Sequence, residues 1–109
     1  MRRYDKLVRD RIPDVIRENG ETPITRTVSG EEYGRRLREK LTEEVTEYLE
    51  DGDPDELADV LEVVYALGEH DGLSAETLHE RREAKARERG RFADGVVLEA
   101  VRESDSSHG

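Results

Sequence analysis

Two stretches of helical periodicity meet at a Gly-Asp-Pro break at residues 52–54, and this limits the chain to a helical fold. Apolar side chains recur at helical spacing over about 30–50 and again over about 54–69. Asp53 is placed to cap the second helix, and Pro54 suits its first turn. The sequence therefore predicts two consecutive helices joined by a short turn.

Two further helices flank this pair. Pro13 and the pair Asn19-Gly20 bound a short helix near 13–18, and Ser74 and Gly90 bound a last, strongly charged one. The resulting prediction is a mainly α fold, an antiparallel helical bundle assembled by oligomerisation.

Local signals refine this outline. Ser29 with Glu32 predicts a capping box that opens the helix at about 30. Alternating β-branched residues over 23–28 favour a short strand, with 96–101 as its partner, so the fold allows a small two-stranded β element.

Composition limits the size of the core. The chain has 109 residues, of which 33% are hydrophobic and 5% aromatic, so one domain of this length buries a modest core by itself. We predict a single domain over 1–101, a disordered tail over 102–109, and a homodimer or homotetramer. The most apolar helix, 54–69, is the expected core and subunit interface.

Net charge limits the partners. Asp and Glu total 28 against 18 Lys and Arg, a net charge of -10, which argues against a nucleic-acid polymer or an anionic membrane as partner. The absence of Cys excludes thiolate chemistry. No apolar run approaches the ~20 residues of a membrane span, and the start does not resemble a signal peptide. We therefore expect a cytoplasmic protein.

Four carboxylates fall on helix faces that should be buried. Helical winding puts Glu44 inside the apolar stripe of the first long helix and Glu47 on its edge. Glu56 and Asp59 share the apolar face of the second. Because buried, unpaired carboxylates cost several kcal/mol or more each, this set needs a counter-charge. Oxygen ligands of this kind select Mg²⁺ or Mn²⁺ over Zn²⁺.

Simpler readings of the same residues stay open. Glu56 also fits a capping box with Asp53. Glu43, Glu44 and Glu47 also fit a solvated helix face. The conjunction of Glu-x-x-Glu on one helix with Glu-x-x-Asp on the next favours a metal site, because a spacing of three puts both carboxylates of each pair on one face.

The ordered motifs resemble a known family. Glu43-Glu44-Val45-Thr46-Glu47 followed by Glu56-Leu57-Ala58-Asp59 is similar to the EExxE and ExxD motifs of the MazG-like, all-α nucleoside triphosphate pyrophosphohydrolases. Segments 4–13, 23–26 and 87–92 resemble the phosphoribosyl-ATP pyrophosphohydrolase-like branch.

This resemblance implies an activity and a ligand set. It implies hydrolysis of a nucleoside triphosphate to the monophosphate and pyrophosphate by a helical homodimer or dimer of dimers. The implied Mg²⁺ ligands are Glu44, Glu47, Glu56 and Asp59. Glu43 would be an accessory ligand or a base that orients water, so the expected catalytic residues are Glu43, Glu44 and Glu47.

Basic groups must offset the triphosphate charge that these carboxylates would repel. On the last helix, Lys85 and Arg89 share one face. Lys6, Arg9 and Lys40 are the other candidates for phosphate contact.

The substrate stays open among several alternatives. Glu62-Val63 stands where true phosphoribosyl-ATP pyrophosphohydrolases carry a Tyr-His pair. This favours removal of non-standard or damaged nucleotides over phosphoribosyl-ATP hydrolysis. The alternative from another class is a non-catalytic helical interaction module with a structural metal site.

Overall fold

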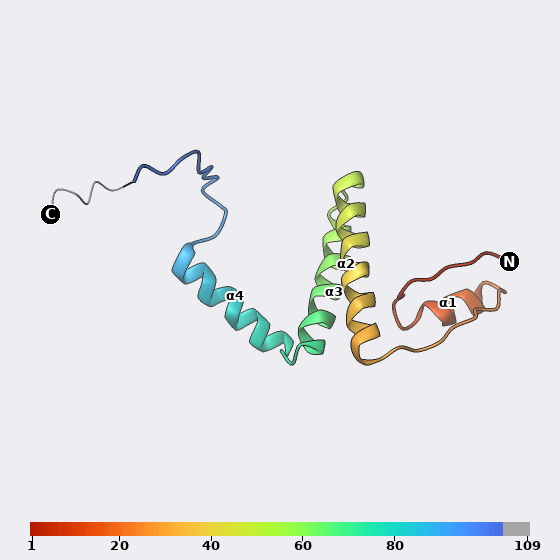
Figure 1. Ribbon diagram of the computed structural model, residues 1–109. Helices are drawn as coiled ribbons and strands as arrows, with labels where there is room; N and C mark the ends of the chain where they lie inside the picture. Colours follow the sequence, from red (N-terminus) through yellow and green to blue (C-terminus); the bar gives the residue numbers. More distant parts are fainter. Residues whose placement is uncertain (104–109) are drawn as a thin grey trace. The chain divides into compact units, whose positions relative to one another are not determined.

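The computed structural model describes residues 1–103 and is mainly helical, as predicted. Its four helices are α1 (Ile12–Glu18), α2 (Gly30–Asp51), α3 (Asp55–His70) and α4 (Ala75–Arg89), shown in Figure 1. The chain divides into two compact units, Met1–Leu78 and a second that begins at His79, inside α4. The candidate carboxylates all lie in the first unit.

The turn between α2 and α3 forms as the sequence indicates. Gly52 adopts a left-handed backbone (φ 69°) and its N–H donates to the Tyr48 carbonyl at 2.8 Å, a conformation that favours glycine after a helix. The Asp53 carboxylate accepts the Asp55 N–H at 2.9 Å, and Pro54 precedes α3 directly. The chain thus reverses, and α3 packs back along α2 (Figure 1).

The core between α2 and α3 is small. Leu37 and Val63 are its buried apolar side chains, 3% and 8% exposed, among the residues described. Gly34 and Gly68 are also buried and let neighbours approach closely. A Cβ at Gly34 would lie 2.5 Å from His70 Nε2. The expectation of a modest core is therefore confirmed for the single chain.

One of the two expected caps at Ser residues is formed and the other is not. Ser74 Oγ accepts the Thr77 N–H at 3.1 Å at the start of α4. Ser29 occupies the N-cap position of α2 but its side chain makes no capping bond. The predicted capping box with Glu32 is wrong because Arg26 binds the Glu32 carboxylate at 2.7 Å instead.

The expected β element is not formed in residues 1–103. Segments 23–28 and 96–101 have no regular secondary structure, and Val96, Val97 and Leu98 are largely exposed. A lone two-stranded ribbon is marginal in water, so alternation of β-branched residues alone does not produce one. Of the predicted tail, 102–103 are irregular and 104–109 lie outside the described residues.

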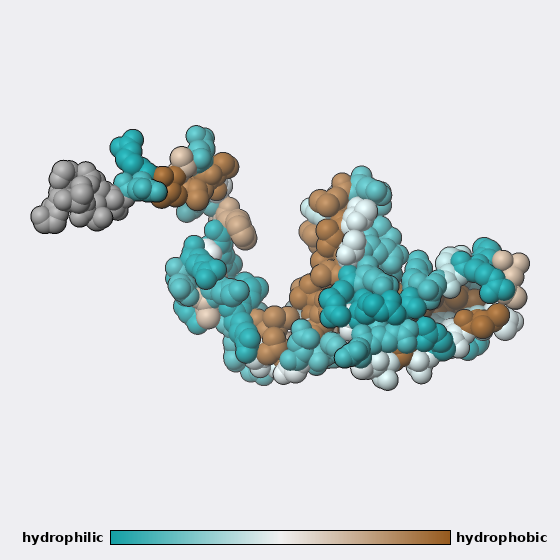
Figure 2. All heavy atoms as spheres, viewed as in Figure 1, coloured by the Kyte–Doolittle hydropathy of each residue, from teal (hydrophilic) through white to brown (hydrophobic). Residues whose placement is uncertain are grey.

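An apolar stripe remains open to solvent on the hairpin. Val45 and Leu49 on α2 and Leu57 and Leu61 on α3 are 37%, 74%, 47% and 49% exposed. Each pair is spaced i, i+4 and so shares a helix face. Figure 2 shows hydrophobic side chains gathered along this hairpin. None of the helices in the described range is long and apolar enough to cross a membrane.

Candidate functional site

The antiparallel hairpin sets the register of the four candidate carboxylates. Glu47 and Glu56 lie on either side of the turn, close enough that the Glu47 charge acts on Glu56. Glu44 and Asp59 each lie three residues further from the turn, nearly one helical turn. The two pairs therefore lie at neighbouring levels of the hairpin.

Glu44 is the buried member of the set, 8% exposed, as the periodicity predicted. Its carboxylate lies 3.1 Å from Lys40 Nζ, one turn earlier on α2. Partial burial lowers the pKa of Lys40, but the hydrogen bond to Glu44 and the charges of Glu43 and Glu44 outweigh it and raise the pKa. Lys40 thus stays charged and supplies the counter-charge that Glu44 needs.

Glu43 lies between two ammonium groups. Lys6 Nζ is 3.3 Å from its Oε1 and Lys40 Nζ is 3.3 Å from its Oε2. Partial burial opposes ionisation of Glu43, but the two lysines prevail and hold its pKa below the ordinary value. The carboxylate is therefore ionised at neutral pH.

Glu47 and Glu56 carry an excess of negative charge. The neighbouring Glu44 carboxylate is the main reason that the pKa of Glu47 is raised. The pKa of Glu56 is raised to about 7, mainly because its carboxyl loses contact with solvent. A hydrogen bond to the Asp51 carboxyl and the charges around the turn add to the shift. Glu56 Oε2 is buried and has no hydrogen-bond partner.

The alternative role of Glu56 as part of a capping box is not formed. The Asp53 carboxylate accepts the Asp55 N–H, and α3 begins without a side-chain cap. The unpartnered oxygen of Glu56 is therefore not explained by helix capping.

Asp59 is paired with the N-terminal segment. Arg9 Nη2 lies 2.6 Å from Asp59 Oδ1, and both side chains are about half exposed. Arg36 holds the same segment by bonds to the Asp5 carbonyl oxygen at 3.0 Å and the Asp5 carboxylate at 2.9 Å. We call residues 4–9 the N-terminal strap. The anchor between Arg36 and Asp5 could not be predicted from the sequence, because no local pattern marks an ion pair between distant residues.

The carboxylates offer the right donors for a divalent ion but are not gathered around one point. No group of three or more His, Asp or Glu side chains within residues 1–103 is arranged to hold a metal ion. Lys40 and Arg9 hold Glu44 and Asp59. The donor chemistry thus fits Mg²⁺, whereas the present positions do not form a closed site.

The remaining basic candidates belong to the second compact unit. Lys85 and Arg89 are on α4 in the second compact unit, so their contact with phosphate stays a prediction. In the same unit, the Glu83 carboxylate lies 3.1 Å from His79 Nε2 and 4.0 Å from Arg82 Nη2.

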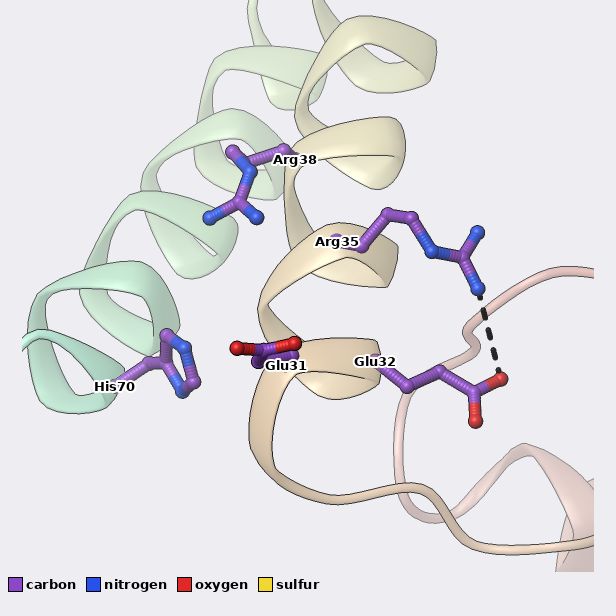
Figure 3. A pocket seen from close by; sticks show the side chains of 5 residues that line it. All are labelled: Glu31, Glu32, Arg35, Arg38 and His70. Atoms are coloured by element: carbon purple, nitrogen blue, oxygen red, sulfur yellow. Dashed lines mark ion pairs between the residues drawn. The ribbon is translucent and has the colours of Figure 1, made fainter.

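A shallow pocket of about 700 Å³ lies at the opposite end of the hairpin from the turn. Figure 3 shows the side chains that line it, from the start of α2 and the end of α3: Glu31, Glu32, Arg35, Arg38 and His70. Arg35 pairs with Glu32 at 3.7 Å. None of the predicted site residues lines this pocket.

Comparison with known proteins assigns no function. No protein-family profile matches the chain, and no solved structure is similar to it. An uncharacterized protein of Mycolicibacterium smegmatis is 57% identical over 42 residues, which cover 38% of this chain and 43% of that protein. The matched stretch is thus less than half the length of the relative. The MazG-like resemblance stays a prediction.

Proposed function

We propose that this chain is a Mg²⁺-dependent nucleoside triphosphate pyrophosphohydrolase that acts on non-standard or damaged nucleotides. The observation that carries the proposal is the buried, unpartnered Oε2 of Glu56 opposite Glu47, in a pair whose pKa values are both raised. A divalent cation would stabilise the ionised form of such a pair, because attraction to the cation replaces repulsion between the carboxylates. Mn²⁺ has the same ligand preference.

Each residue of the proposed site has a role that its surroundings support. Glu44, Glu47, Glu56 and Asp59 would hold the ion, and Glu44 would exchange Lys40 for it. A bound divalent ion lowers the pKa of water and offsets charge on a triphosphate. Glu43, held ionised by Lys6 and Lys40, would act as an accessory ligand of the ion or as a base that orients the attacking water.

Phosphate binding falls to the cations around these carboxylates. Lys6, Arg9 and Lys40 lie at the proposed site in ion pairs with its carboxylates. Lys85 and Arg89 on α4 are kept as further proposed phosphate-binding residues. Positioning and charge are the main demands of phosphoryl chemistry, and these side chains supply both.

Self-association is part of the proposal. Two buried apolar side chains form the core of the described chain, while four on the apolar stripe are exposed. A homodimer, or a tetramer made of two dimers, would bury the stripes against one another. We also propose a cytoplasmic location and no nucleic-acid polymer as partner, in keeping with the net charge of -10.

The test is pyrophosphate release from a panel of nucleotides. The panel contains standard, deoxy and oxidised nucleoside triphosphates and phosphoribosyl-ATP, each with and without Mg²⁺. We expect release that requires Mg²⁺ and that Glu56→Gln and Glu47→Gln both reduce by at least about 100-fold, as for other groups that stabilise a transition state.

The matched control is Glu50→Gln, which removes one carboxylate from the exposed surface of α2 and should keep full activity. Phosphoribosyl-ATP as the preferred substrate would replace the proposed substrate class. Equal activity with and without Mg²⁺, or in Glu56→Gln, would contradict the metal assignment.

A second candidate is a non-catalytic helical module with a structural metal site. The exposed apolar stripe favours it, because such a face also suits a partner helix. This function predicts no pyrophosphate release from any nucleotide and a Mg²⁺-dependent rise in melting temperature that Glu56→Gln removes.

A further inference from the structure

The N-terminal strap occupies the carboxylates of the proposed site from outside the hairpin. Lys6 lies 3.3 Å from Glu43, and Arg9 lies 2.6 Å from Asp59. The strap therefore contacts α2 with one cation and α3 with the other. Each of its two cations thus pairs with one carboxylate of the acidic surface.

An independent contact holds the strap in this position. Arg36, whose side chain is 11% exposed, bonds both the carbonyl oxygen and the carboxylate of Asp5. The Lys6 ammonium also lies 5.8 Å from the centre of the Tyr4 ring, within the range of a cation–π contact. The anchor at Asp5 keeps Lys6 and Arg9 near the site even when they release their carboxylates.

We infer that the strap is an internal counter-ion that a divalent cation and a polyphosphate displace together. The cation would take the carboxylates Glu43 and Asp59, and the polyphosphate would take Lys6 and Arg9. The site would thus bind the metal complex of a polyphosphate cooperatively and each component alone weakly. This inference rests on the proposed function, because it concerns the same carboxylates.

The charges explain why the two ligands would need each other. A divalent cation alone would leave Lys6 and Arg9 without partners and would meet their repulsion. A polyphosphate alone would be repelled by the carboxylates Glu43 and Asp59. When both arrive, each ion pair is exchanged for another, so neither the two carboxylates nor Lys6 and Arg9 are left without a partner.

The strength of the existing pairs permits this exchange. The side chains of Lys6, Arg9 and Asp59 are 46%, 55% and 42% exposed, and exposed ion pairs contribute little to stability. Removing them should leave the helices intact. Coupling between two ligands of this kind typically changes affinity by about 5- to 150-fold.

The test is calorimetric titration of the full chain with Mg²⁺ alone, tripolyphosphate alone and the Mg²⁺–tripolyphosphate complex. The variant is Lys6→Gln combined with Arg9→Gln. We expect it to bind Mg²⁺ alone at least about fivefold more tightly than the wild type, and the complex at least about fivefold more weakly.

The matched control is Arg2→Gln combined with Arg17→Gln. These two arginines also form exposed ion pairs, with Glu21 at 2.6 Å and Asp14 at 2.9 Å. The control therefore removes the same net charge without touching the strap contacts. We expect it to bind all three ligands as the wild type does, and circular dichroism should show the same helix content in both variants.

Three outcomes would overturn the inference. The first is unchanged Mg²⁺ affinity in the strap variant, even if the complex binds more weakly. The second is an equal gain of Mg²⁺ affinity in the control, which would show a general effect of net charge. The third is no Mg²⁺ binding by any variant. Tighter Mg²⁺ binding by the strap variant, with no pyrophosphate release by the wild type, would reject the proposed function and keep the strap's role.

Discussion

Arg9 Nη2 and Asp59 Oδ1 lie 2.6 Å apart although 50 positions separate the two residues in the chain. This ion pair joins the N-terminal strap to α3, while Lys6 joins the strap to Glu43 on α2. Two cations from one short segment thus reach the carboxylates of two helices. Two carboxylates of the acidic motif, Glu43 and Asp59, are therefore paired with the strap, while Glu47 and Glu56 keep an excess of negative charge.

Glu56→Gln should change how stability depends on pH. The pKa of Glu56 is about 7 in the fold against an ordinary value of 4.5, so the folded chain binds this proton more tightly than the unfolded chain. The contribution to the free energy of unfolding is complete below about pH 4.5 and is lost as pH rises towards 7. Above pH 7, without divalent ions, Glu56→Gln should be more stable than the wild type. The difference should shrink as pH falls and disappear below about pH 4.5.

Urea unfolding of both proteins at pH 5 and pH 8 measures this. Glu50→Gln, on the exposed surface of α2, provides the control and should differ from the wild type by the same amount at both values. A constant difference between Glu56→Gln and the wild type would show that burial of Glu56 has no effect on its proton affinity.

Leu37→Ala should be the most damaging of the apolar truncations. Leu37 is 3% exposed, and deleting a buried leucine side chain costs about 2–5 kcal/mol. Chemical denaturation measures the loss. Leu98→Ala, at a site 77% exposed, should change stability by less than about 0.5 kcal/mol, and equal effects of the two would contradict the assigned core.

Ser74→Ala should destabilise the chain by about 1 kcal/mol, because Ser74 Oγ accepts the Thr77 N–H at the start of α4. Ser29→Ala is the matched comparison, since Ser29 holds the same position before α2 without a side-chain bond. Its effect on thermal unfolding should be close to zero. A larger effect at Ser29 would mean that its hydroxyl caps α2 after all.

Leu61→Glu should dissociate the proposed oligomer. Leu61 is 49% exposed on the apolar stripe, and a charge there would be buried without a partner on association. Light scattering coupled to size exclusion should show a smaller species than the wild type at the same concentration. Val97→Glu, which changes a side chain 80% exposed outside the hairpin, should leave the mass unchanged. A wild type that is monomeric at every concentration would reject the oligomer itself.

The helix boundaries could be predicted from the sequence because the signals that set them are local. Gly52, Pro54 and Ser74 act within a few residues of their own positions, and each helix begins or ends within about two residues of its predicted limit. The buried position of Glu44 could be predicted as well, since the helical period decides which face of the helix a residue occupies.

The sequence by itself thus determined the helices and the buried position of Glu44, while tertiary structure decided the exposure and the partners of the other carboxylates. Ser29 makes no capping bond, and the Glu32 carboxylate pairs with Arg26 instead. Asp59 pairs with Arg9, which is 50 positions away in the sequence. The physical reason is distance: backbone propensity acts over a few residues, whereas an ion pair depends on which charges folding brings within about 4 Å.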